Sequence, residues 1–327
     1  MSDRIVTPEG QNNEREQEAQ LRPQNFSEFI GQKKVVENID LMVKSALVRK
    51  TAMDHVLLSG PPGLGKTSLA MLIAKSLGSE LHLVSGPAIE KKGDLAAVLT
   101  NLKPKDVLFI DEIHRLHITV EEILYSAMED FRLDILIGQG ASARTMQIDL
   151  AAFTLIGATT RSGLLSNPLR DRFMSHLNFE FYEPDMLAVI LKNNALKMGI
   201  NLSQEAIAQI STRARGTPRI ANRILRRVRD FALVNKTKLV GPTEVQAALH
   251  LLDIDNLGLD SMDRKILQVM KNYYSGGPVG IDALSATLGE DKQTIEEVYE
   301  PYLLKQGLIL RTPRGRVLSD MANKHIT

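Results

Sequence analysis

The chain has 327 residues, 43% of them hydrophobic, and this length predicts two or three domains with a sizeable core. Its formal net charge is only +1 at pH 7, so any nucleic-acid binding must come from local basic patches. The absence of cysteine excludes disulfides and thiolate metal sites and fits a reducing cytoplasm. No stretch approaches about 18 consecutive apolar residues and no secretory signal is present, so we expect a cytoplasmic protein without membrane spans.

The N-terminal region divides into a polar tail and an apolar entry segment. Residues 1–20 offer little to bury, so we expect a mobile tail. The segment LRPQNFSEFIGQ, which starts at Leu21, carries apolar side chains that could cover an adenine base or form a plain domain-entry loop. Apolar residues at helical spacing then predict a core-facing helix over 35–49.

The clearest motif is a phosphate-binding loop between a strand and a helix. The apolar run Val56–Leu58 predicts a buried strand, and GPPGLGKT (60–67) follows it in the pattern G-x-x-x-x-G-K-[ST]. Its glycines allow positive φ, so that backbone N–H groups can surround phosphate oxygens. Lys66 places a cation near the β- and γ-phosphates, and the Thr67 hydroxyl can ligate Mg²⁺. The motif predicts a nucleoside triphosphate site at the N-terminus of a helix over 67–77.

A second buried strand ends in two carboxylates. After a strand predicted at 81–84 and a helix at 93–102, the apolar run 107–110 leads into Asp111 and Glu112. Buried parallel strands read as continuous apolar runs, so both acids are expected at a sheet edge. Together with the phosphate-binding loop they form a Walker B element, in which Asp111 belongs to the Mg²⁺ shell and Glu112 orients the attacking water. A surface turn holding both acids is the alternative.

Two histidines follow this acidic pair. His114 and His117 are spaced like metal ligands, but no third ligand with suitable spacing is near them. We therefore do not expect zinc there. His114 is expected to pack or hydrogen-bond beside the acidic pair.

Two alternating arms with glycines between them predict a β-hairpin at 133–150. It follows a helix predicted at 121–129 and turns at Gly138-Gln-Gly140. Its apolar residues are Leu133, Ile135, Ile137, Met146, Ile148 and Leu150. These are more than a single hairpin needs, so they belong either to the core or to a docking surface for another protein.

Polar and basic residues follow another buried strand, Phe153–Ala158. The pair Thr159-Thr160 stands at its tip, where a hydroxyl could contact the γ-phosphate or the attacking water. In the next segment, 167–173, two arginines flank Asp171. One of them could point out of its own subunit toward a neighbour's phosphate, or it could form an internal salt bridge with Asp171.

From Tyr182 on, alternating helices and strands give way to helices alone. Four helices are expected, over 186–198, 204–213, 243–252 and from Pro218. Thr217 as N-cap and Pro218 in the first turn place Arg219 just inside a helix N-terminus. The helix dipole and the guanidinium of Arg219 both favour a phosphate at that point.

The segment from Asp260 to the end is typical of a winged helix. Ser261-Met-Asp263 leads into an amphipathic helix that carries apolar residues from Ile266 to Tyr274, and helices over 281–288 and 292–305 follow before the basic hairpin 307–318. The turn in RTPRGR puts three arginines at or beside an exposed tip: Arg311, Arg314 and Arg316. Cations there suit phosphate contact and groove insertion without base readout. Winged helices also bind proteins, and that alternative stays open.

Together these segments resemble one family, the RuvB proteins, AAA+ ATPases that drive branch migration of bacterial Holliday junctions. The resemblance runs from Leu21 to about Val317 and rests on GPPGLGKT, LFIDEIHRL, AMED, FTLIGATTR, PLRDRF, RGTPRIANR and RTPRGR. It implies an α/β AAA+ P-loop domain with a parallel sheet and flanking helices, an all-α lid and a C-terminal winged helix. We expect a tail at 1–20 and domains at 21–182, 183–255 and 256–327.

The pattern and the resemblance together imply the site residues. The expected nucleotide-binding residues are Leu21, Arg22, Gly60, Gly63, Gly65, Lys66, Thr67, Ser68, Glu129, Asp130, Phe131, Arg172, Tyr182 and Arg219. The expected catalytic residues are Lys66, Asp111, Glu112, Thr160 and Arg172. Thr160 would be sensor 1, with Thr159 as fallback, Arg172 the trans-acting arginine finger and Arg219 sensor 2. Thr67 and Asp111 would bind Mg²⁺, the latter through water, and Arg311 and Arg316 would touch DNA beside Arg314.

The resemblance also implies partners and an activity. It implies an ATP-driven homohexameric ring on duplex DNA that moves Holliday junctions in recombination and repair. A RuvA-like junction-binding protein would dock on the hairpin Leu133–Leu150, and a RuvC-like resolvase would be a further partner. The alternative is an ATP-gated DNA-binding switch of replication-initiator type without processive translocation.

Two positions depart from the family pattern. Ala151-Ala152 stands where two prolines are usual, and Met174 stands where a glycine is usual. Neither supplies chemistry. The first could loosen the base of the hairpin, and the second could alter the turn after the arginine finger.

Overall fold

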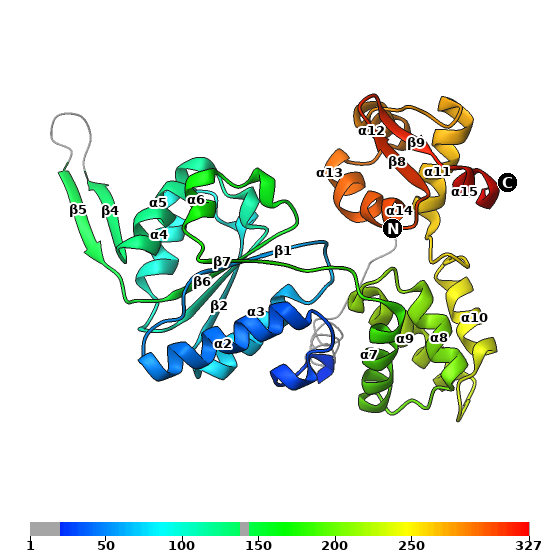
Figure 1. The fold of residues 1–327 in the computed structure, drawn as a ribbon, viewed down its shortest axis with the longest axis horizontal. Helices are drawn as coiled ribbons and strands as arrows, with labels where there is room; N and C mark the ends of the chain where they lie inside the picture. The colour runs from blue at the N-terminus through cyan, green and yellow to red at the C-terminus, as the bar shows by residue number, and fades with distance from the viewer. Residues whose placement is uncertain (1–19, 138–143, 327) are drawn as a thin grey trace, which may run out of the picture. The chain divides into compact units, whose positions relative to one another are not determined.

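The computed structural model describes residues 20–137 and 144–326 (Figure 1). Two compact units form, one of Met1–Gly60 with Gly65–Glu180 and one of Pro61–Leu64 with Phe181–Thr327. Within the described ranges, no helix combines the length and the apolarity that crossing a bilayer requires.

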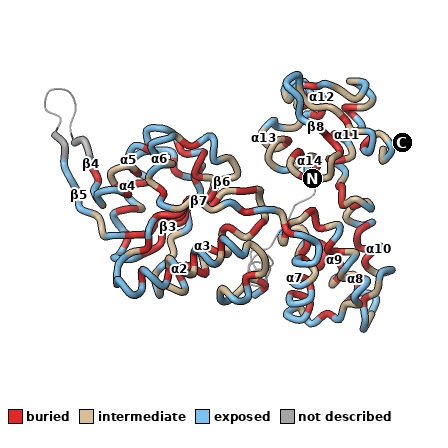
Figure 2. The backbone as a smooth tube through the Cα atoms, in the orientation of Figure 1, coloured by how far each residue is buried: buried red, intermediate tan, exposed pale blue. Residues whose placement is uncertain are grey.

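The first unit is built on a parallel sheet in the order β2-β3-β6-β1-β7. Its strands are β1 (Val56–Ser59), β2 (Leu81–Ser85), β3 (Val107–Asp111), β6 (Thr154–Thr159) and β7 (Ser175–Asn178). The central strands are apolar runs that are buried along nearly their whole length (Figure 2). Because β3, β6 and β1 are neighbours, the residues that follow them lie at one edge of the sheet.

Helices cover both faces of this sheet. They are α2 (Lys33–Arg49), α3 (Lys66–Leu77), α4 (Lys92–Thr100), α5 (Ile118–Glu129) and α6 (Asn167–Asp171). α2 and α3 lie on one face, and α4 and α5 lie on the other (Figure 1). Leucines of α4 and α5 pack there against Leu108 and Leu155 of the sheet. Single 3₁₀ turns occur at Phe26–Glu28, Gly86–Ala88, Ile113–Arg115 and Ser162–Leu164.

The predicted hairpin is present and projects from the first unit (Figure 1). β4 (Arg132–Ile137) pairs antiparallel with β5 (Arg144–Asp149), with Leu133 opposite Ile148. The predicted turn at Gly138-Gln-Gly140 lies outside the described residues. At the base, Leu133 is buried in the core with Ile148 packed against it, so this part of the hairpin belongs to the core.

The helices expected after Tyr182 are present in the second unit. They are α7 (Pro184–Lys197), α8 (Gln204–Arg213), α9 (Pro218–Val234) and α10 (Pro242–Leu251). The N-terminus of α9 forms as its sequence dictates, because the Thr217 hydroxyl accepts a hydrogen bond from Ile220 N. Apolar residues of α9 spaced by three and four, such as Ala221, Ile224 and Val228, are buried.

A winged helix completes the second unit. Its elements are α11 (Ser261–Tyr274), α12 (Ile281–Leu288), α13 (Lys292–Thr294), α14 (Glu300–Lys305), β8 (Ile309–Thr312), β9 (Gly315–Leu318) and α15 (Asp320–His325). The helix predicted over 292–305 is interrupted by a π-helical turn at Ile295–Tyr299, just before Pro301, which has no N–H to close a regular α-helical bond. α15 was not predicted. Below, the β8–β9 hairpin is called the wing.

A buried ion pair joins the lid helices to the winged helix within the second unit. Arg215 precedes α9, its side chain is 7% exposed, and its Nη1 and Nη2 lie 2.7 and 3.1 Å from the carboxylate of Asp263. Nη1 also lies 3.3 Å from Asp260, and the guanidinium stacks 4.7 Å from the centroid of the Tyr302 ring. Burial raises the pKa of Asp263 to about 7, and the charge of Arg215 opposes that rise.

Candidate functional site

The phosphate-binding loop joins β1 to α3 as the motif predicts. Gly60, Gly63 and Gly65 all have positive φ, at 134°, 79° and 105°. At Gly60 a Cβ would come within 2.5 Å of the Phe179 carbonyl oxygen, so only glycine fits. Lys66 begins α3 and its Nζ donates to the Gly60 carbonyl at 2.7 Å. Thr67 and Ser68 follow in the first helical turn, where the helix dipole favours an anion.

The acidic pair lies at the end of β3, next to the strand that carries the threonines. Asp111 Oδ1 accepts a hydrogen bond from Glu112 N at 3.0 Å, and Glu112 has a left-handed φ of 50°. Glu112 Oε2 lies 3.0 Å from Arg115 Nη1. A Cβ on Gly86 would come within 2.5 Å of the Glu112 carbonyl oxygen. Sequence reasoning gave no role to Gly86 or Arg115, although the spacing of Arg115 from Glu112 was a signal for their salt bridge.

The two threonines differ in their surroundings. Thr159 is buried at the end of β6, and its hydroxyl lies 3.0 Å from His114 Nδ1 and accepts from Arg161 N. Its carbonyl accepts from Gly60 N, which fixes β6 against the start of the phosphate-binding loop. Thr160 is half-buried and directly follows the last residue of β6. His114 therefore hydrogen-bonds beside the acidic pair, as expected.

In the second unit, Arg219 and Tyr182 lie against the middle of the phosphate-binding loop. Arg219 N donates to the Gly63 carbonyl at 3.3 Å, and a Cβ on Gly63 would be 2.9 Å from the Arg219 Cβ. The Tyr182 hydroxyl donates to the Leu64 carbonyl at 3.2 Å, and its backbone N–H donates to the Gly216 carbonyl. The predicted sensor arginine thus lies beside the loop that it is expected to serve.

The remaining predicted nucleotide residues belong to the first unit. Leu21 is buried, and the Arg22 guanidinium donates to the Met71 sulfur on α3. Asp130 is exposed at the end of α5. The Phe131 ring packs edge-on against the Phe153 ring at 5.8 Å, in an aromatic cluster within the core.

Arg172 follows α6 and is bound on several sides. Its Nη2 lies 2.9 Å from Glu129 Oε2, and its Nη1 donates to the Pro168 carbonyl at 2.8 Å. Its Nε donates to the Tyr125 carbonyl, and its Cζ lies 4.7 Å from the centroid of the Tyr125 ring. The salt bridge considered from the sequence, with Asp171, is not the one that Arg172 makes, because Glu129 on α5 lies within reach instead.

The wing arginines do not all stand at an exposed tip. Arg314 is exposed in the turn, and the side chain of Arg311 is 56% exposed. The prediction was wrong for Arg316, whose side chain is 11% exposed, because it pairs with Glu300 at 2.9 Å and Glu296 at 3.0 Å. Arg311 Nε also donates to Glu300 at 2.7 Å.

Glu300 is the anion beneath the wing. It is buried, and Arg311 and Arg316 lie opposite each other on β8 and β9 with Glu300 bound to both. Burial acts to raise the pKa of Glu300, but the hydrogen bonds from the two arginines outweigh it, and the pKa is lowered. Glu300 therefore remains ionised and fixes the wing.

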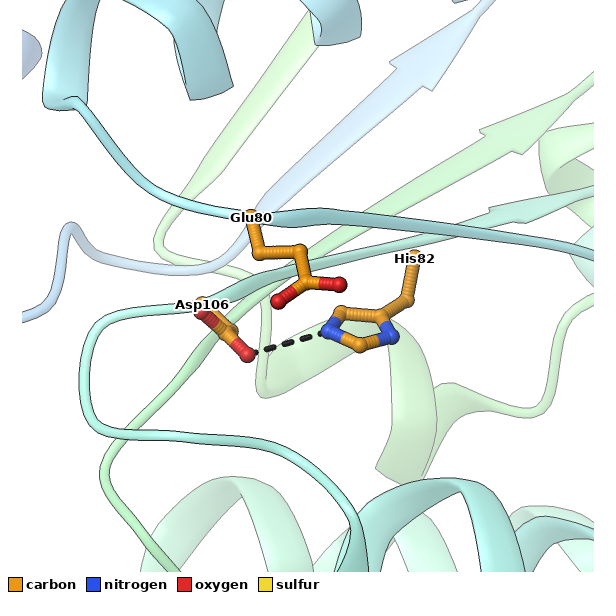
Figure 3. A group of neighbouring side chains, drawn as sticks. All are labelled: Glu80, His82 and Asp106. Carbon is orange, nitrogen blue, oxygen red and sulfur yellow. Dashed lines mark hydrogen bonds and ion pairs between the residues drawn. The ribbon is translucent and has the colours of Figure 1, made fainter.

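Another cluster, at the start of β2 and β3, has the composition of a metal site. In the described parts of the chain, Glu80, His82 and Asp106 bring their ligand atoms within 4.8 Å of one another (Figure 3). His82 Nε2 lies 3.0 Å from Asp106 Oδ2, Lys103 Nζ lies 3.1 Å from Glu80, and Lys103 N donates to Asp106. The two acids therefore already bind the Lys103 ammonium group, the His82 ring and the Lys103 backbone N–H. They lie at the opposite ends of β2 and β3 from Asp111.

Comparisons with known proteins agree along the whole chain. Residues 21–179 match the Holliday junction DNA helicase RuvB P-loop domain, 182–255 the RuvB AAA lid domain and 256–327 the RuvB C-terminal winged helix domain. The chain belongs to the RuvB family. It is therefore an AAA+ ATPase with a P-loop domain, an all-α lid and a winged helix.

Relatives of this RuvB-family chain cover nearly its full length. A Holliday junction branch migration complex subunit RuvB of Paramagnetospirillum magneticum is 52% identical over 326 residues, which cover 100% of this chain and 93% of that protein. The RuvB subunit of Granulibacter bethesdensis is 54% identical over 309 residues, which cover 94% of this chain and 86% of that protein. A structure described as the Thermotoga maritima RuvB Holliday junction branch migration motor is 49% identical with a TM-score of 0.87, covering 94% of this chain and 98% of its own.

Proposed function

We propose that the chain is the ATP-hydrolysing subunit of a motor that drives branch migration of Holliday junctions. The observation that carries this proposal is the match to RuvB proteins over the full chain, with a P-loop, a Walker B pair and a winged helix all present. The relatives named above are branch migration complex subunits, and the Thermotoga structure is described as the motor. The proposed domains are 21–182, 183–255 and 256–327.

The nucleotide site is proposed to bind ATP with Mg²⁺. Lys66 would neutralise phosphate charge, and its present acceptor, the Gly60 carbonyl, holds it at the loop. Thr67 and Asp111 would hold the metal, the latter through water, and the bound metal would draw charge from the phosphate oxygens. Glu112 would orient the attacking water. Because the Thr159 hydroxyl already forms a hydrogen bond with His114, we propose that Thr160 is the residue that senses the γ-phosphate.

Hydrolysis is proposed to need two subunits of a hexameric ring. Arg172 would reach a neighbour's γ-phosphate, where a guanidinium stabilises charge that develops in the transition state. Glu129 and Asp130 would border the same nucleotide. Arg219, beside Gly63, would report the state of the nucleotide in its own subunit to the lid.

The winged helix is proposed to contact duplex DNA through the exposed Arg314 and Arg311, while Arg316 would hold the wing in place through Glu300. Contacts of this type bind phosphate and carry no base code. The hairpin Leu133–Leu150 is the proposed dock for a RuvA-like junction-binding protein, and a RuvC-like resolvase is a further proposed partner. A cytoplasmic location is also part of the proposal.

Strand exchange on a synthetic four-way junction tests the function. Purified protein with ATP, Mg²⁺ and the junction-binding partner should separate the junction into duplexes, with many ATP molecules hydrolysed per assembly. The Glu112→Gln variant should bind ATP and DNA but support neither reaction. A single turnover per assembly, without strand exchange, would instead identify an ATP-gated DNA-binding switch.

A further inference from the structure

The guanidinium of Arg172 is already oriented within its own subunit. Its Nη2, Nη1 and Nε bind Glu129, the Pro168 carbonyl and the Tyr125 carbonyl, at 2.9, 2.8 and 3.3 Å. The Tyr125 ring supports the group from below, with its centroid 4.7 Å from Cζ. Although the side chain is 29% exposed, each of its nitrogens has a bond that fixes its direction.

Tyr125 is in turn fixed by a buried polar group. Its hydroxyl lies 2.9 Å from Ser166 Oγ, and Ser166 Oγ donates to Glu121 Oε2 at 2.5 Å. Glu121 is buried, and this burial raises its pKa, which the hydrogen bonds from Ser166 and Tyr125 oppose. Ser166 is also the N-cap of α6 and accepts from Leu169 N, so the same hydroxyl sets the start of the helix that leads to Arg172.

The three supporting residues of α5 share one helix face. Glu121, Tyr125 and Glu129 are spaced by four, and side chains at this spacing stack along a helix. The first anchors Ser166, the second supports the guanidinium and the third binds it. One face of α5 therefore serves Arg172 along two helical turns.

We propose that Tyr125 is a positioning residue for the arginine finger: it holds the Arg172 guanidinium in direction through its ring and carbonyl, anchored by Ser166 and Glu121. The inference rests on the proposed role of Arg172 at a neighbour's ATP. Glu129 keeps the guanidinium paired until the more highly charged γ-phosphate replaces it. An arginine side chain loses conformational entropy when it is ordered. Because Tyr125 already orders Arg172 in its own subunit, this entropy is lost before the transition state forms.

The Tyr125→Leu variant tests the proposal by removing the ring and the hydroxyl. We expect kcat for ATP to fall by about 10²-fold, as for a misplaced catalytic group, with KM changed less than about threefold. Tyr125→Phe keeps the ring and should lose less than Tyr125→Leu. Tyr273→Leu, at a tyrosine that is 74% exposed on α11, is the matched control and should keep the wild-type kcat. Thermal melting identifies a variant that has not folded, and Tyr125→Phe then carries the test.

Mixed assemblies separate this inference from the proposed function. Tyr125→Leu subunits have an intact nucleotide site, and Glu112→Gln subunits have an intact finger. Mixing them should restore turnover, because a Tyr125→Leu site can be served by its neighbour's Arg172. Arg172→Ala mixed with Glu112→Gln serves as the reference and should show the same recovery.

Each outcome decides the matter. A wild-type kcat for Tyr125→Leu overturns the inference. So does a low kcat of Tyr125→Leu that mixing fails to restore while mixing does restore Arg172→Ala. Neither result contradicts the proposed intersubunit role of Arg172. Failure of Arg172→Ala itself to recover in mixed rings overturns the proposed intersubunit site. Recovery of both variants supports the inference.

Discussion

Replacing Asp263 by alanine should loosen the winged helix from the lid helices. Asp263 is completely buried and binds both terminal nitrogens of Arg215, at 2.7 and 3.1 Å. It also accepts from Asp260 N at 3.0 Å, within the capping box of α11. Among the described residues, the Asp263→Ala variant leaves the Arg215 guanidinium with the more distant Asp260 as its acidic partner.

The expected loss is large because a charge remains buried. Breaking a buried ion pair by removing one partner costs about 3–5 kcal/mol, and the lost cap adds about 1 kcal/mol. Each 1.4 kcal/mol corresponds to a factor of ten in an equilibrium constant. Amide hydrogen exchange in α11 should therefore be faster by about 10³- to 10⁴-fold in the Asp263→Ala variant.

Hydrogen exchange of the full chain, read by peptide, measures this loss. The matched control is Asp253→Ala, which removes a surface salt bridge to Arg264 from a side chain that is 66% exposed. Such a pair contributes about 1 kcal/mol or less, so α11 should exchange nearly as in the parent protein. If Asp263→Ala changes exchange no more than Asp253→Ala does, the buried pair does not hold these elements together and the reasoning is refuted.

Three further predictions follow from the site, the wing and the buried ion pair. Arg172→Ala should lower kcat for ATP by about 10³- to 10⁵-fold while nucleotide binding is kept, and unchanged hydrolysis would exclude the finger. Arg314→Ala should weaken DNA binding and reduce the slope of log K against log salt concentration by about one. Filter binding over a salt series measures this slope, and an unchanged slope excludes the phosphate contact. The pKa of Asp263 is raised from 3.8 to about 7, so the folded state binds the extra proton. Its contribution to stability should thus decline as pH rises from about 4 to 7, and urea unfolding of Asp263→Asn should lack this decline.

The nucleotide site was predictable because its signals are local in the sequence. Strand, loop and helix follow one another within 56–77, and the acidic pair directly follows a buried strand. The roles of Thr159 and Thr160 were harder to separate, since adjacent residues of a strand point to opposite faces. The contact of Thr159 with His114, which is distant in sequence, is the observation that supports our assignment of Thr160 rather than Thr159 as sensor 1.

The wing shows where sequence reasoning was insufficient. Its basic residues and turn were visible, but the burial of Arg316 depends on Glu300, which lies on the preceding helix. Arg311 and Arg316 are cross-strand partners, and like charges opposite each other are unfavourable without an anion between them. Hairpin register combined with this charge argument could have predicted a buried carboxylate beneath the wing.

The short segment between Arg215 and Arg219 is held at three points in the second unit. Arg215 forms an ion pair with Asp263, the Arg219 N–H donates to the Gly63 carbonyl, and the Thr217 hydroxyl caps α9. Five consecutive residues therefore connect the Asp263 ion pair, the start of α9 and the Gly63 carbonyl, so a substitution anywhere in 215–219 acts on all three contacts.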